Sequence, residues 1–204
     1  MTRRQFISTA GAAVIPCSAT IPLIVPVRLV MDSRAKSTPA QVRRFSASIW
    51  PEAVRDFKGG GIELQSTQVT GAVGRSPGDR PVFTGLDPGT INFVITDHIP
   101  MKWAQGKGLA GVSTQYDGYR LSMVALDYAH GDQIPFVSVN TCVHELLHVL
   151  LQDIFEVRPK GLADYEREIR IDWLATRLWI FHDGSAVRAA AYAYLNRKQD
   201  VKIL

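Results

Sequence analysis

The pattern of apolar and polar positions divides the chain into a strand-rich part and a helical part. Between residues 62 and 129, short β-prone runs are separated by clusters of glycine and proline, which is typical of strands joined by turns. From about Val139 onward, the apolar positions recur with the period of a helix. Strands followed by helices predict an α+β domain with a small mixed β-sheet.

Individual elements can be placed within this pattern. Pro51 stands where a first helical turn tolerates proline, which predicts a short helix over SIWPEAVRDF that ends at the glycines 59–61. The dipeptide DG at 117–118 predicts a hairpin between two strands. The expected strands are IELQSTQVT, TINFVITD, AGVSTQY and YRLSMVALDY, and the expected helices cover about 139–156, about 162–181 and SAVRAAAYAYLNRK.

The N-terminal segment has a different character. Residues 1–30 combine a basic start with a long, mildly hydrophobic stretch rich in small residues and proline, which is typical of a targeting segment. The hexapeptide TRRQFI resembles the twin-arginine export signal, which the twin-arginine translocation machinery recognises. We therefore expect residues 1–40 to be a leader and linker, and residues 41–204 to be one domain, exported to the periplasm or outside the cell.

The sequence leaves the processing of this leader open. Small-x-Ala sites for cleavage occur at 17–19, 33–35 and 38–40. The stretch from Ile7 to Val30 is also long enough to span a bilayer, so an uncleaved leader would anchor the protein in the membrane.

Composition and charge narrow the choice of function. The 204 residues with 46% hydrophobic content suit one compact domain. The first 31 positions hold Arg3, Arg4 and Arg28 without any acidic residue, whereas the remainder carries 20 basic and 19 acidic residues. The net charge of +4 therefore comes mainly from the leader, and a nucleic-acid partner is not expected. Only Cys17 and Cys142 are present, so the chain without its leader has no intrachain disulfide.

The candidate chemistry is concentrated in HELLH, residues 144–148, within an apolar, helix-forming stretch. Residues four apart share a helix face, so His144 and His148 can reach one cation. Glu145 lies one residue along, where its carboxylate can contact a water on that cation. This HExxH pattern is typical of a zinc site in which the glutamate acts as general base. The other interpretation is a buried helix with coincidental histidines.

A catalytic zinc usually takes three protein ligands, so a further residue is needed. The extended pattern HExxHxxGxxH is not met, because Leu151 and Ile154 occupy its glycine and third histidine positions. The break at VRPKG allows the next helix to fold back on the HELLH helix. The sequence therefore predicts that the third ligand comes from this next helix.

Glu168 and Asp172 lie four apart on one face of that helix. We expect Glu168 to be the third ligand, with Glu166 and Asp164 as substitutes, and Asp172 to orient a ligating histidine from behind. The competing interpretation is a surface ion network of these carboxylates with Arg167, Arg170 or Arg177.

The segments HELLH and EIRIDWLA, some twenty positions apart, resemble the gluzincin-type zincin metallopeptidases over about residues 139–182. The resemblance implies a minimal zincin-like domain with zinc ligands His144, His148 and Glu168, the base Glu145, and Asp172 behind the ligands. Leu147 and Ile171 depart from the small residues that are usual at these places in such families.

Other residues carry weaker expectations. His98, His130 and His182 are isolated in the sequence and are expected in loops or on the surface. Tyr165 and His182 are candidates to stabilise the oxyanion of a tetrahedral intermediate. The segment GVSTQYDGYRLSMV is expected either to supply an edge strand that binds an extended peptide or to form an ordinary hairpin.

Together these features predict an exported zinc metallopeptidase with one Zn²⁺ and a peptide or protein substrate. In this hypothesis Glu145 deprotonates the attacking water and returns the proton to the leaving amine. The alternatives are a non-catalytic exported protein that holds zinc for structure or metal handling, and a membrane-anchored interaction protein without a metal.

Overall fold

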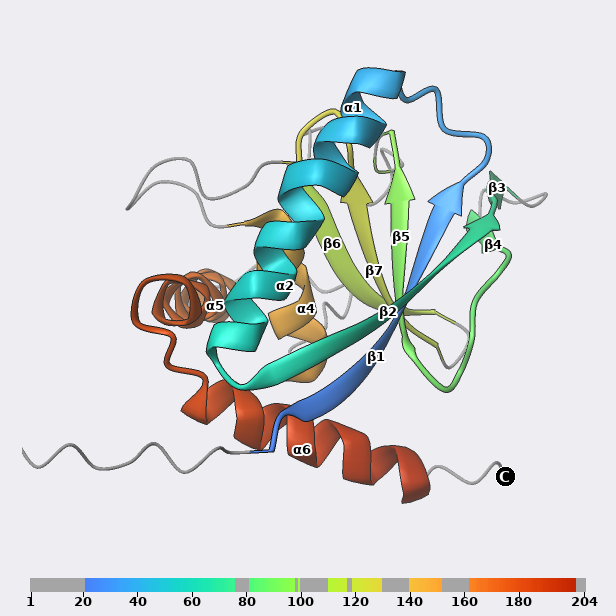
Figure 1. Cartoon of the computed structure of the whole chain (residues 1–204). Helices are drawn as coiled ribbons and strands as arrows, with labels where there is room; N and C mark the ends of the chain where they lie inside the picture. The colour runs from blue at the N-terminus through green and yellow to red at the C-terminus, as the bar shows by residue number, and fades with distance from the viewer. Residues whose placement is uncertain are drawn as a thin grey trace, which may run out of the picture.

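The centre of the protein is a five-stranded mixed sheet with the strand order β2-β1-β5-β7-β6 (Figure 1). Its computed structural model describes residues 21–75, 81–97, 99, 110–116, 119–129, 140–151 and 162–200. The parallel strands are β1 (Leu23–Asp32), β2 (Ile62–Gly71), β5 (Ile91–Thr96) and β7 (Tyr119–Ala125), and β6 (Gly111–Tyr116) is the antiparallel edge strand. Strands β3 (Val73–Arg75) and β4 (Pro81–Phe83) form a separate antiparallel pair. The predicted α+β class with a mixed sheet is confirmed.

Strand β1 corrects the domain boundary expected from the sequence. It lies inside the sheet, where it pairs with β2 on one side and β5 on the other. Its buried side chains lie on both faces, which gives a nearly continuous apolar run instead of a clear alternation. Such a run is similar to the hydrophobic part of a leader. The folded domain includes residues 21–40, and the predicted boundary at residue 41 is wrong.

The position of β1 also reduces the number of possible cleavage sites for the expected leader. Cleavage at 33–35 or 38–40 would remove β1 from the sheet, so neither site is compatible with the fold. The last residues of the expected bilayer span from Ile7 to Val30 also lie in β1. Within the described part of the chain, no helix combines the length and apolar character needed to cross a bilayer. The signal motif and the site at 17–19 lie outside the described residues and stay predictions.

A continuous helical segment connects β1 to β2. It consists of α1 (Pro39–Arg44), the π-helical turn η1 (Phe45–Ile49) and α2 (Trp50–Gly59). A reciprocal pair of hydrogen bonds between Thr38 and Gln41 caps its start. Its end is set by the glycines, since Gly61 has a φ of 77° that other residues rarely adopt. The predicted helix and its glycine stop are confirmed, although helical structure begins well before the predicted start.

The hairpin and the C-terminal helices follow the predicted order. Tyr116 pairs with Tyr119 across the β6–β7 turn, as expected for a hairpin around residues 117–118. Helices α4 (Thr141–Leu150), α5 (Leu162–Phe181) and α6 (Ser185–Asp200) complete the described chain. The first of them ends at Leu150, earlier than the predicted Glu156.

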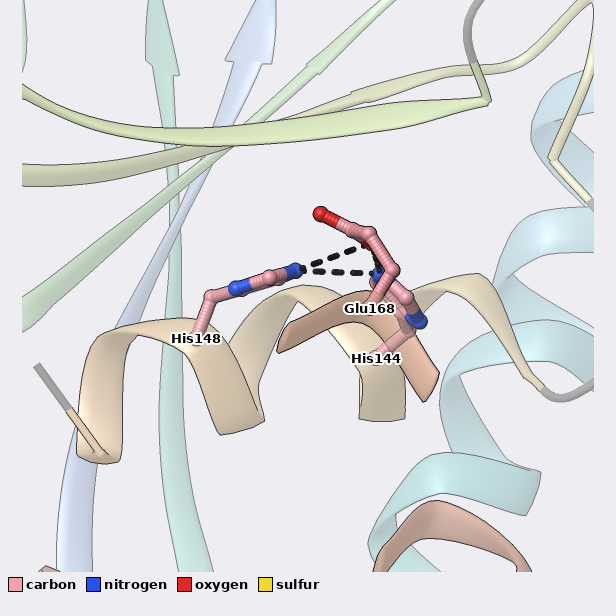
Figure 2. Close-up of side chains that lie close together, drawn as sticks. All are labelled: His144, His148 and Glu168. Carbon is pink, nitrogen blue, oxygen red and sulfur yellow. Dashed lines mark hydrogen bonds and ion pairs between the residues drawn. The ribbon is translucent and has the colours of Figure 1, made fainter. Parts of the chain in front are cut away.

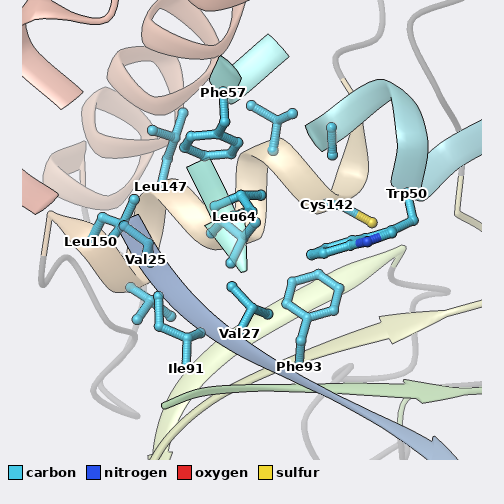
Figure 3. Packing of buried hydrophobic residues seen from close by; sticks show 14 of the residues in the cluster. Val25, Val27, Trp50, Phe57, Leu64, Ile91, Phe93, Cys142, Leu147 and Leu150 are labelled. Carbon is cyan, nitrogen blue, oxygen red and sulfur yellow. The ribbon is translucent and has the colours of Figure 1, made fainter. Parts of the chain in front are cut away.

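The helices pack on one face of the sheet. Residues two apart on a strand share a face, and Val25 with Val27, and Ile91 with Phe93, meet helix residues there (Figure 3). The helical side of this core includes Trp50, Phe57, Cys142, Leu147 and Leu150. The opposite face carries a second apolar cluster that includes Val30, Val94, Leu121 and Met123. The central strands are therefore buried on both faces.

We predict that a chain starting at residue 41 does not fold, whereas a chain starting at residue 21 does. β1 buries Val25, Val27, Leu29 and Val30, and each side chain contributes about 1.5–3 kcal/mol by burial, so their sum is comparable with the whole stability of a domain. Circular dichroism and thermal melting of the two chains check this. A cooperative melt of the chain that starts at residue 41 would contradict the role of β1.

Candidate metal centre

Helix α4 places the HELLH residues in the middle of the protein. Nine of its ten residues are buried, and it packs against β6, β7, α2, α5 and α6. The Asn140 side chain accepts hydrogen bonds from the N–H groups of Cys142 and Val143, which satisfies donors at the helix start. The amide of Asn140 also donates to the Ile49 carbonyl at 2.8 Å. These contacts fix the helix start against the segment that precedes α2.

Three side chains from α4 and α5 converge on one point (Figure 2). The Nε2 atoms of His144 and His148 are 3.1 Å apart. Glu168 Oε2 lies 3.0 Å from the first of these nitrogens and 3.5 Å from the second. Helix α5 thus folds back on α4, as the sequence predicts, and brings Glu168 to the two imidazoles.

Asp172 fixes the orientation of one of these imidazoles. Its Oδ1 atom lies 2.8 Å from His144 Nδ1, and because an ionised carboxylate only accepts, Nδ1 must be the donor. In the neutral ring, the proton is then on Nδ1 and the lone pair of Nε2 faces Glu168 and His148. The predicted contact between Asp172 and a histidine is present, and it is the arrangement found behind metal-ligating histidines.

The pKa values of the cluster residues show that the site favours positive charge. Burial opposes protonation of His144, but its hydrogen bonds to Asp172 and Glu168 and the nearby Glu145 raise its pKa to about 10. Burial likewise opposes protonation of His148, yet the Glu168 hydrogen bond raises its pKa. For Glu168, burial is outweighed by both histidines, so its pKa lies well below the usual range. Acceptor atoms meet here, and either protons or a cation must lie between them.

The geometry fits a zinc ion. Ligand atoms at 2.0–2.1 Å from a tetrahedral zinc are about 3.3 Å apart. The three separations between the donor atoms of His144, His148 and Glu168 lie between 3.0 and 3.5 Å. Two imidazoles and one carboxylate are also a ligand set that zinc accepts in catalytic sites. These residues therefore could hold zinc with little rearrangement.

Glu145 faces the sheet rather than the next helix. Its side chain is buried, and Oε2 accepts a hydrogen bond of 2.7 Å from the Ser113 hydroxyl on β6. Burial raises the pKa of Glu145, against the opposing effects of His144, His148 and the Ser113 hydrogen bond. The carboxylate thus lies against the edge strand, on the same helix as the two histidines whose charge it influences.

The other candidate site residues either lie away from the donor cluster or lie outside the described residues. Glu166 is exposed and lies outside the donor cluster, which contains Glu168 instead. The side chains of Asp164 and Tyr165 lie outside the described residues, as do His98 and His130. Glu168 and Asp172 both contact His144, and Arg177 pairs with Asp183.

The proposed oxyanion role of His182 is wrong. His182 follows the last residue of α5, and at 1.5 Å per residue it lies about 20 Å along the helix axis from Glu168. Its ring instead lies against Gly59 at the end of α2, where an added Cβ would meet Nδ1 at 2.5 Å. The side chain is exposed, as expected for an isolated histidine.

Sequence reasoning did not identify the groups that hold Glu145. Ser113 and Ser122 are opposite each other in the β6–β7 register, and their hydroxyl oxygens are 2.8 Å apart. The signal available in the sequence was the DG turn, because it sets the hairpin register and so places the two serines together. Their contact with α4 is long-range and has no local pattern.

The sequence was also compared with known proteins. No family model matches the chain, and no curated protein matches it significantly. The assignment of the site therefore depends on its geometry.

We predict that Asp172→Ala weakens zinc binding by about 10–100-fold, because the ring of His144 loses the acceptor that holds it. The fold should be unaffected, since the Asp172 side chain is 55% exposed. Zinc titration against a competing chelator, together with a thermal melt of the metal-free protein, measures both effects. Glu166→Ala on the exposed side of the same helix is the matched control. Equal zinc affinity of the two variants would contradict this role.

Proposed function

We propose that the protein is a zinc-dependent peptidase that hydrolyses peptide bonds. The observation that carries the proposal is the convergence of three acceptor atoms, from His144, His148 and Glu168, together with the buried carboxylate of Glu145 on the same helix as the two histidines. Structural zinc sites usually have four protein ligands, whereas catalytic sites have three and keep one position for water or substrate. Within the described residues, the cluster has three members. This count supports a catalytic site.

The proposed roles of zinc, Glu145 and Asp172 follow from the surroundings of these residues. When bound, zinc would polarise the scissile carbonyl and make hydroxide available near neutral pH. Glu145 accepts the proton of the attacking water and returns it to the leaving amine. Its burial, which raises its pKa, makes it a stronger base than an exposed carboxylate. Asp172 keeps His144 in the tautomer that a ligand needs.

Access to solvent also supports a catalytic site. The Glu168 side chain is 41% exposed, although it belongs to the donor cluster. A purely structural site gains nothing from such access, whereas a substrate must reach the donor cluster. Glu168 lies on the α5 side of α4, and Glu145 lies on the β6 side of the same helix.

Strand β6 is the candidate binding element for the substrate. It pairs with β7 along one side and is the last strand of the sheet, so its other side is an edge among the described strands. An extended peptide adds to such an edge through main-chain hydrogen bonds. Since Ser113 of β6 contacts Glu145, a peptide on this edge would lie next to the base. This supports the edge-strand interpretation of the segment GVSTQYDGYRLSMV, which begins at Gly111.

We further propose that residues 1–19 are a twin-arginine signal that is removed after Ala19. The motif TRRQFI supports the export route, and the small-x-Ala site at 17–19 is the one of the three that leaves β1 intact. This route exports folded proteins, which suits a metal inserted before export.

Zinc content and peptide hydrolysis together test the proposed enzyme. We predict about one zinc per chain in the wild type and in Glu145→Gln, and loss or weakening of zinc in His144→Ala and Glu168→Ala. Hydrolysis of a mixed peptide library, followed by mass spectrometry, should occur with the wild type and be absent with Glu145→Gln. Bound zinc without any hydrolysis in the wild type would favour the non-catalytic zinc protein instead. No zinc under metal-replete conditions would overturn both.

Export can be tested separately from the enzyme. We predict that changing Arg3 and Arg4 to Lys abolishes export of the full chain, and that the exported wild type begins at Thr20. The control changes Arg43 and Arg44, an exposed pair on α1, to Lys. Cell fractionation and N-terminal mass spectrometry give the result, and export that is insensitive to the first pair would contradict the twin-arginine signal.

A further inference from the structure

We propose that Ser113 and Gly111 of the edge strand are positioning residues for the general base Glu145. This inference rests on the proposed function and adds residues that its chemistry requires. Both residues lie two apart on β6, so they share the strand face that meets α4. One of them supplies a hydrogen bond to the carboxylate, and the other supplies the space for it.

The hydrogen bond comes from a buried network of two serines. Ser113 Oγ lies 2.7 Å from Glu145 Oε2 and 2.9 Å from the Glu145 carbonyl oxygen. Ser122 Oγ lies 2.8 Å from Ser113 Oγ and 3.4 Å from the same carbonyl. Each hydroxyl has one proton. The short contact to the carboxylate takes the proton of Ser113, and Ser122 donates to Ser113 or to the carbonyl.

This assignment separates the roles of the two serines. Ser113 contacts the carboxylate, whereas the Ser122 hydroxyl contacts the backbone carbonyl of Glu145 and the Ser113 hydroxyl. All three side chains are buried, at 0–5% exposure, so no bulk water replaces a lost hydroxyl easily. A buried carboxylate that loses its donor changes orientation or protonation. Ser113 therefore holds Oε2 and fixes the direction of the carboxylate.

Gly111 supplies the space. A Cβ atom at this position would overlap Oε1 of Glu145 and would lie 2.5 Å from Cγ and 2.7 Å from Cδ. The carboxylate thus lies directly on the strand backbone. Any larger residue at position 111 must displace Glu145, because the Cγ and Cδ atoms cannot both move away without a different rotamer.

The consequence is a direct connection between substrate binding and the base. The strand that would bind a peptide through its outer edge also orients Glu145 through its inner face. A base must lie within about 3 Å of the proton that it abstracts, so a small rotation of the carboxylate is sufficient to reduce turnover. The positions of peptide and base are therefore set by one strand.

The test compares Ser113→Ala and Gly111→Ala with the matched control Ser122→Ala, and uses Glu145→Gln as the reference for loss of the base. One sample of each full-length protein is loaded with cobalt(II), whose visible absorption reports the coordination environment. A separate zinc-loaded sample is assayed for zinc content and for kcat and KM on a peptide that the wild type cleaves. We expect unchanged metal content in all variants. For Ser113→Ala and Gly111→Ala we expect kcat to fall about 10–100-fold with little change in KM, and the cobalt spectrum to shift toward that of Glu145→Gln.

The outcomes separate the two proposals. If Ser113→Ala and Gly111→Ala keep the wild-type spectrum and kcat, as expected of Ser122→Ala, the positioning role is overturned and the peptidase proposal stands. If the wild type binds cobalt but cleaves no peptide, the peptidase proposal fails, and the spectra alone decide whether Ser113 and Gly111 position Glu145. A wild type that takes up neither metal overturns both.

Discussion

A helix that is buried on almost every side must find partners for its polar side chains in the elements around it. Helix α4 is such a helix, since it packs between the sheet and three other helices. Asn140 at its start is satisfied by the segment before α2, Glu145 by β6, and His144 by α5. An unsatisfied buried polar group costs about 1–3 kcal/mol, so these contacts also determine how the neighbouring elements can dock. The contacts that satisfy the polar side chains of α4 therefore determine both the packing of the fold and the geometry of the site.

The donor cluster that α4 forms with Glu168 of α5 is a second group of polar side chains that need partners. Two imidazoles and a carboxylate direct acceptor atoms at one another, and Asp172 accepts a hydrogen bond from Nδ1 of His144, so the neutral ring has no proton at Nε2. A protein that needed only a stable core would gain by replacing such a group with apolar residues of similar size. The chain instead keeps four ionisable side chains in contact, which is reasonable where a cation is the partner.

The part of this site that the sequence predicts is the part that depends on local spacing. His144, Glu145 and His148 lie on one helix, and Glu168 and Asp172 on the next, so helical periodicity and one fold-back are sufficient. Ser113 and Gly111 contact Glu145 only through the sheet, and no local pattern reveals that. Strand β1 was misassigned for a related reason, because an apolar run buried on both faces does not alternate. His182 was misplaced because proximity to a helix end gives no distance from the middle of that helix.

The position of β1 has a consequence for how the chain assembles. Its sheet partners come later in the sequence, and Val27 pairs with Ile91 of β5 only after the whole helical segment and β2 have been made. Parallel pairing over such separations forms slowly, because the intervening loop must be closed before any contact stabilises it. During synthesis, β1 is therefore an exposed apolar segment that follows residues 1–20 in the sequence and has no sheet partner yet. Strand β1 becomes buried when the sheet folds. A protein that binds the N-terminal segment before β5 has been synthesised therefore meets an exposed β1, whereas in the folded protein β1 is buried.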